Sequence, residues 1–116
     1  MHKTLPYIAE KDLYWLAGWL EGEGSFCWHY TNKRKYKYPM IVGGSTDEDV
    51  IAKCAGLLNR SYLKHSLHNG RPSTKHMYRF RLVGKQAATV MLIIHHLMGI
   101  RRQEKIKSIL EEYNAN

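Results

Sequence analysis

The most informative run in the sequence is Leu16-Ala17-Gly18-Trp19-Leu20-Glu21-Gly22-Glu23-Gly24. Apolar residues spaced three and four apart predict a helix over residues 12–24, with Asp12 as its N-terminal cap. Glu21 and Glu23 would stand at the negative end of the helix dipole, where each carboxylate costs about 0.3–1 kcal/mol. A bound divalent cation would supply the missing positive charge. The alternative is a glycine-capped helix end with surface glutamates.

Glycines within this run point to a second feature of the helix. Gly18 and Gly22 lie four residues apart, on one face of the helix. Glycine in a helix interior costs roughly 1 kcal/mol relative to alanine. We therefore expect another backbone to approach this face closely.

Two pairs of strands are predicted C-terminal to this run, over residues 25–45 and 60–83. Residues 25–30 carry an aromatic side chain at every second position, and residues 35–42 alternate again after a turn. Gly43-Gly44-Ser45-Thr46 is expected to break the strand, and Thr46 to begin a helix that reaches about Asn59. Further strands are predicted at 61–68 and 76–83 around an Asn69-Gly70 turn, followed by helices at 85–98 and 101–113.

This order of elements predicts the fold class. The strands within each pair follow one another without an intervening helix, so the chain is expected to be α+β, with one antiparallel four-stranded sheet. The helices would cover one face of the sheet and leave the other open. The 116 residues are expected to form a single domain, 1–116.

The charge is unevenly distributed along the chain. The sequence has 18 Lys and Arg against 10 Asp and Glu, a formal charge of +8. Segments 24–45 and 60–83 together hold ten of the basic residues and no acidic one. This pattern favours a surface that faces phosphates over a merely solvated one. Because a β-ribbon can enter the major groove, the open sheet face is expected to bind double-stranded DNA.

Composition also excludes several classes of protein. A chain this short is not expected to enclose an organic cofactor. Its longest apolar run, residues 87–94, is far below the ~20 residues of a membrane span, so no membrane association is expected. The N-terminus has no secretory pattern, which predicts an intracellular protein. Cys27 and Cys54 lack metal-ligand spacing, and paired glutamates without a sugar cleft argue against a glycosidase.

The run at residues 16–24 resembles the nine-residue signature of the LAGLIDADG homing endonucleases, with Glu in place of Asp at 21 and 23. The order of elements is similar to the core of that family over roughly the whole chain. One copy of the signature is typical of the homodimeric branch. The resemblance implies an αββαββα fold whose sheet forms a DNA-binding saddle, plus a C-terminal helix.

Roles for individual residues follow from the resemblance. The motif helices of two subunits would pack together through Leu16, Gly18, Trp19 and Gly22. Glu23 would bind Mg²⁺, or Mn²⁺ in its place, with the carbonyl of Gly22, and Arg101 and Arg102 would complement the charge at the phosphate. The family often has Gln and Lys where this chain has Gly44/Ser45 and Arg101/Arg102. The residues expected to contact DNA are Ser25, Cys27, His29, Lys33, Lys35, Lys37, Tyr62, Lys64, Ser66, Met77, Arg79 and Arg81.

The implied function is a homodimeric, Mg²⁺-dependent endonuclease that cuts both strands of a long pseudo-palindromic site during intron or intein mobility. Such a protein would act in the cytoplasm of a prokaryote or phage-infected cell, or in an organelle that encodes its own intron. The alternative is a protein of the same fold that binds nucleic acid without cleaving it, as an intron maturase or a transcription regulator. A generic basic nucleic-acid-binding module is a third possibility.

Overall fold

The computed structural model describes residues 7–66 and 76–115. The elements along the chain are α1 (Glu10–Glu23), β1 (Gly24–Thr31), β2 (Tyr36–Ser45), α2 (Glu48–Leu57), β3 (Leu63–Ser66), β4 (His76–Val83), α3 (Lys85–Ile94), the 3-10 helix η1 (His95–Leu97) and α4 (Ile100–Asn114). The α+β class and the αββαββα order with an added C-terminal helix are confirmed. The expected Asn69-Gly70 turn lies outside the described residues.

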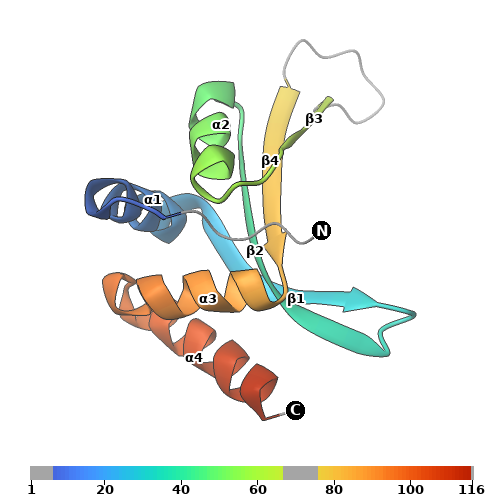
Figure 1. Ribbon diagram of the computed structural model, residues 1–116. Helices are drawn as coiled ribbons and strands as arrows, with labels where there is room; N and C mark the ends of the chain where they lie inside the picture. The colour runs from blue at the N-terminus through green and yellow to red at the C-terminus, as the bar shows by residue number, and fades with distance from the viewer. Residues whose placement is uncertain (1–6, 67–75, 116) are drawn as a thin grey trace.

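The four strands form one antiparallel sheet in the order β1-β2-β4-β3. β1 pairs with β2 along its whole length, from Gly24 opposite Gly43 to Thr31 opposite Tyr36. β4 pairs with β2 only from Met40 to Ser45. The outer part of the β1–β2 hairpin therefore extends beyond β4 as a two-stranded arm, residues 29–38 (Figure 1).

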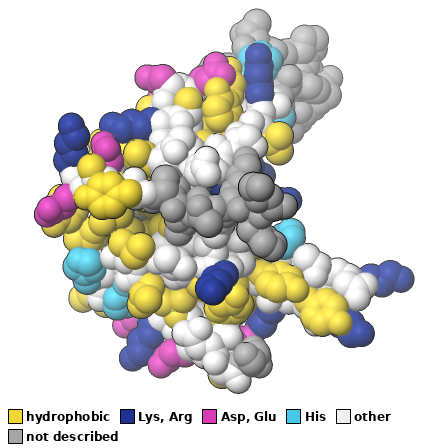
Figure 2. Space-filling view, in the orientation of Figure 1, with side chains coloured by type: hydrophobic (Ala, Val, Ile, Leu, Met, Phe, Trp, Pro, Cys, Tyr) yellow, Lys and Arg dark blue, Asp and Glu magenta, His cyan; other side chains and the backbone are white. Residues whose placement is uncertain are grey.

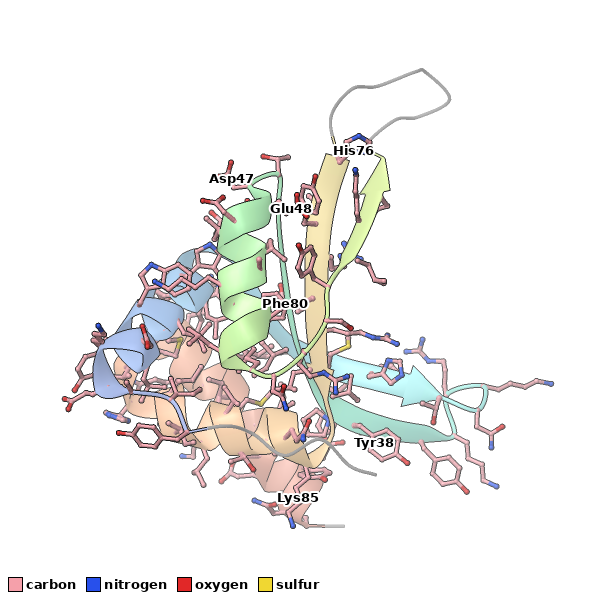
Figure 3. The ribbon with its side chains drawn as sticks, turned by 45° about the horizontal axis from the view of Figure 1, so that its top comes forward. Tyr38, Asp47, Glu48, His76, Phe80 and Lys85 are labelled. Carbon is pink, nitrogen blue, oxygen red and sulfur yellow. The ribbon has the colours of Figure 1, made fainter. Side chains whose placement is uncertain are left out.

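The hydrophobic core lies between the sheet and the helices. Leu16 and Leu20 of α1 are fully buried, as are Ile41 of β2 and Phe80 of β4. Figure 1 shows the helices gathered on one side of the sheet, with the hairpin arm projecting away from them. Figure 3 shows Phe80 between β4 and the helical layer. Among residues 7–66 and 76–115, no helix covers the opposite face of the sheet.

The start of α1 differs from the prediction. The helix begins at Glu10, with Ala9 at the N-cap and no capping side chain. Asp12 lies in the first turn, where its charge is favourable at the positive end of the dipole but caps nothing. Asp12 as the helix cap is therefore wrong.

The predicted break after residue 42 is also wrong. β2 continues to Ser45, because Gly43, Gly44 and Ser45 pair with β4. A Cβ on Gly43 would lie 2.6 Å from the Trp19 ring, which is too close for a side chain. Glycine at this position therefore lets Trp19 of α1 pack against β2, and it does not end the strand. α2 begins at Glu48, two residues after Thr46, and the chain leaves it through the left-handed Asn59 (φ 55°).

Within the described residues, no helix combines the length and apolar character that a membrane span requires.

Candidate nucleic-acid interface

Glu21 is held in place by residues of the C-terminal helix. Its carboxylate accepts hydrogen bonds from the backbone N–H of Gly99 and from Arg102 Nε, the latter at 3.0 Å. Arg102 Nη1 also donates to the carbonyl oxygen of Gly24 at 2.7 Å. The guanidinium thus neutralises a carboxylate at the unfavourable end of the α1 dipole. The expectation that both motif glutamates lack compensation is wrong for Glu21.

Glu23 differs from Glu21 in its exposure and in its lack of partners among the described residues. It is the last residue of α1, its side chain is exposed, and it has no hydrogen bond or ion pair among residues 7–66 and 76–115. Gly22 is exposed beside it, in the last helical turn, where carbonyl groups lack partners within the helix. Two oxygen donors therefore lie next to each other at the junction of α1 and β1.

Basic side chains of α4 border a pocket next to this junction. The pocket has a volume of about 520 Å³ and is lined by Gly24, Ser25, Phe26, Arg101, Arg102, Glu104 and Lys105. Three cationic side chains against one anionic side chain make it suited to a phosphate. Arg101 is exposed, whereas the Arg102 side chain is only 15% exposed and is engaged with Glu21. Arg102 therefore has a structural contact with Glu21, Arg101 and Lys105 are the more available cations, and the catalytic roles expected for Arg101 and Arg102 stay predictions.

The strand register determines which residues line the open face of the sheet. Residues directly opposite each other on antiparallel strands share a face. Phe26 and Ile41 are buried and paired, so their strand neighbours point to the open side. Ser25, Cys27 and His29 of β1 lie there as predicted, and so do Met77, Arg79 and Arg81 of β4.

The phase of β2 is the reverse of the prediction. Lys37 lies on the helix side, where its ammonium pairs with Glu112 of α4 and sits 4.4 Å from the Trp28 ring centroid. Lys37 is therefore not on the proposed DNA face. Sequence reasoning missed the open-face residues of this strand, which are Tyr36, Tyr38, Met40, Val42 and Gly44. Because the buried Ile41 pairs with the buried Phe26, the residues of β2 that alternate with Ile41 face the open side.

The phase of β3 is reversed as well. Lys64 pairs with Tyr78, which faces the helices, and the backbone of Ser66 pairs with that of His76. Tyr62 donates a hydrogen bond to Glu48 of α2 at 2.8 Å and packs against Tyr78. Tyr62 and Lys64 are thus removed from the open face, and the side chain of Ser66 lies outside the described part of the structure. Leu63 and His65 replace them.

The tip of the hairpin arm is basic. Lys33 and Lys35 are exposed there together with Arg34, which stacks on Tyr30 at 4.2 Å from the ring centroid. Asn32, Lys33 and Arg34 all have positive φ angles. Figure 2 shows Lys and Arg side chains at the end of this arm and hydrophobic ones along it. The arm therefore carries cations farthest from the body of the molecule.

Solved structures provide the comparison with known proteins. Two complexes of the homing endonuclease I-CvuI with a target, one with Ca and one with Mg, match 90% of this chain at 14% identity, with TM-scores of 0.65 and 0.66. The LAGLIDADG homing endonuclease I-GzeII, in complex with a DNA target, matches 89% of the chain at 16% identity, with a TM-score of 0.60. The chain has the fold of the LAGLIDADG homing endonucleases.

The LAGLIDADG likeness is one of structure rather than sequence. The chain spans 66–67% of the I-CvuI chains and 36% of I-GzeII. No protein-family model matches the sequence, and no curated protein matches it.

Residues of the LAGLIDADG helix divide between the core and the surface. Leu16 is fully buried, and Trp19 packs on Phe80 with ring centroids 6.0 Å apart. Leu16 is therefore part of the core of this chain, which corrects its expected place in a dimer interface. Trp19 packs against the core but is only half-buried, and its expected contact with a second subunit stays a prediction. Gly18 and Gly22 are exposed, and no atom lies within 4 Å of the position that a Cβ would take on either. The glycine face of α1 therefore leaves room for a second backbone to approach closely.

Proposed function

We propose that the chain is one subunit of a homodimeric, site-specific DNA endonuclease. Each subunit would hydrolyse one strand of a long pseudo-palindromic site with a divalent metal, Mg²⁺ or Mn²⁺ in its place. One observation carries the proposal: the Glu23 carboxylate, which has no partner among the described residues, ends α1 beside the exposed Gly22 and directly before Gly24, the first residue of the pocket lining.

The donor set at this junction suits a hard divalent cation. Glu23 and the carbonyl of Gly22 offer oxygen ligands, and Mg²⁺ is usually held by one or two carboxylates together with substrate oxygens and water. Among the described residues, no group of three or more His, Cys, Asp and Glu side chains lies close enough to hold a metal ion. A cation at Glu23 would therefore depend on DNA oxygens as well as on the protein.

Basic residues of the chain would bind the phosphate and the duplex during hydrolysis. When bound, the cation supplies charge neutralisation at the phosphate and lowers the pKa of a water molecule. Arg101 and Lys105 would bind the non-bridging phosphate oxygens in the pocket. Arg79 and Arg81 would contact the bases of the duplex from the open face.

Cleavage of a randomised plasmid library tests this function. We expect linear product with Mg²⁺ and none with EDTA, and at least a roughly 100-fold slower rate for Glu23→Gln, the typical effect of removing an essential charge-stabilising group. Glu111→Gln, near the far end of α4, is the matched control and should cut like the wild type. If Glu23→Gln cuts as fast as wild type, Glu23 is not the metal ligand.

The same assay distinguishes a non-cleaving role. The engagement of Arg102 with Glu21 leaves fewer cations for the phosphate than the sequence suggested. A protein that selects a specific DNA or RNA site but never cuts it would be a maturase or a regulator with this fold.

A further inference from the structure

Side chains on the open face of the sheet are arranged in rows that cross the strands. The pairing places Cys27, Met40 and Val83 side by side on β1, β2 and β4. We call these three residues the apolar row. The next row toward Glu23 contains Ser25, Val42 and Arg81, and the one after it contains Gly44, Arg79 and Leu63.

The apolar row has no charged member and little capacity for hydrogen bonding. Met40 and Val83 are half-buried, and so is Cys27. Burial raises the pKa of the Cys27 thiol, although the nearby Lys105 opposes this shift. The thiol is therefore protonated at neutral pH and behaves as a small apolar group. A ligand of this row must offer apolar surface in return.

In the major groove, thymine is the base that offers apolar surface, through its C5-methyl group, whereas guanine offers two acceptors that match an arginine. This inference rests on the proposed function. We propose that the apolar row reads thymine methyl groups in the target, and that Arg81 and Arg79 read guanines on the side nearer the cut.

The spacing of the rows gives this proposal a definite pattern. Successive residues on one face are two positions apart, about 6.6 Å along a strand. Base pairs are stacked about 3.4 Å apart, so one row corresponds to about two base pairs. The thymine preference should therefore lie about two base pairs farther from the cut than the guanine preference assigned to Arg81.

Selection of bound sites from a randomised duplex library, in Ca²⁺ to prevent cleavage, tests the pattern. Each selected thymine is then replaced by deoxyuridine, which removes only the methyl group. We expect about fourfold weaker binding for each methyl removed at the positions facing the apolar row. Deoxyuridine elsewhere in the site should bind as thymine does.

Variants of the protein test whether the loss of affinity on removing a thymine methyl group depends on the apolar row. Met40→Gln should bring the thymine-to-deoxyuridine affinity ratio close to one. Val83→Thr, which keeps the shape of the side chain, should at least halve the thymine-to-deoxyuridine affinity ratio. This variant tests the inference if Met40→Gln folds poorly. Arg81→Gln should relax the guanine preference and leave the ratio unchanged. Leu92→Gln, on the exposed side of α3, is the control and should leave both preferences intact.

The outcomes distinguish a failure of thymine recognition by the apolar row from a failure of the proposed endonuclease function. A selected site with equal affinity for thymine and deoxyuridine at every position overturns the inference and leaves the endonuclease proposal standing. A methyl effect that survives both Met40→Gln and Val83→Thr overturns it too. If the wild-type protein selects no DNA site at all, both the inference and the proposed function fail.

Discussion

Arg101 and Arg102 are neighbours in sequence, yet their surroundings assign them to different tasks. Arg102 is engaged with Glu21 and with the carbonyl of Gly24, whereas Arg101 is exposed at the rim of the pocket. Replacing Arg102 removes one of the two hydrogen-bond partners of the partly buried Glu21 carboxylate, and hydrogen bonds to charged groups contribute about 1.5–3 kcal/mol. Replacing an exposed arginine leaves stability nearly unchanged.

We therefore expect Arg102→Gln to lower the free energy of unfolding by about 1.5–3 kcal/mol, and Arg101→Gln by no more than about 0.5 kcal/mol. Arg101→Gln should nevertheless slow DNA cleavage. Urea denaturation followed by circular dichroism measures the first effect, and plasmid cleavage measures the second. Equal stability of the two variants would contradict the role assigned to Arg102.

The sequence identifies Glu23 but not the partner of Glu21. The cost of a carboxylate at a helix C-terminus is visible locally, so both glutamates stand out from the sequence alone. Arg102 lies 81 residues further along the chain, and only the packing of α4 against β1 brings it near the end of α1. Sequence reasoning consequently missed the contact between Arg102 and Glu21.

Among the elements, the turn of the β1–β2 hairpin combines backbone strain with charge. Lys33 has a φ of 55°, a left-handed conformation that costs a residue with a Cβ roughly 1–2 kcal/mol and glycine almost nothing. Lys33→Gly should therefore stabilise the protein by about 0.5–1 kcal/mol in urea denaturation.

Although Lys33→Gly should stabilise the fold, loss of the Lys33 charge should weaken DNA binding. If Lys33 contacts a phosphate, the slope of log affinity against log salt should fall in magnitude by about 0.9. Lys35→Gly is the matched control, because it removes the same charge and Lys35 is not among the residues with positive φ. An equal gain in stability from both variants would show that strain at Lys33 is not the cause.

In each pair of strands, the sequence reveals the open face of one strand but not of the other. In β1, the aromatic alternation predicts the face correctly, since Phe26 is buried. In β2, lysines and tyrosines alternate, and both types have an apolar body with a polar end, so either can cover the core side. The buried Ile41 opposite Phe26 decides the phase in favour of the tyrosines on the open face. β3 is only four residues long and offers too little alternation to decide.

For the whole molecule, the decisive question is whether two copies meet along the glycine face of α1. Gly18 is exposed and has open space around its Cβ position. A leucine there would clash with a second helix packed at close range, while the isolated chain would tolerate it. We expect Gly18→Leu to convert a dimer to a monomer in analytical ultracentrifugation. Gly56→Leu, at an exposed and equally open position on α2, should leave the dimer intact.

Failure of that experiment would have a clear meaning. If wild type and Gly18→Leu are both monomers at high concentration, the chain holds only half of a double-strand cutting site. A nick in one strand would then be the most that Glu23 could achieve.

The hairpin arm has a consequence for how proteins with this fold change over generations. None of residues 29–38 is buried, so substitutions there leave the hydrophobic core untouched. Stability limits most of the mutations that a small domain can accept, but it places little restriction on this segment. A lineage could therefore drift toward a new recognition sequence in small steps, each one folding as well as the last.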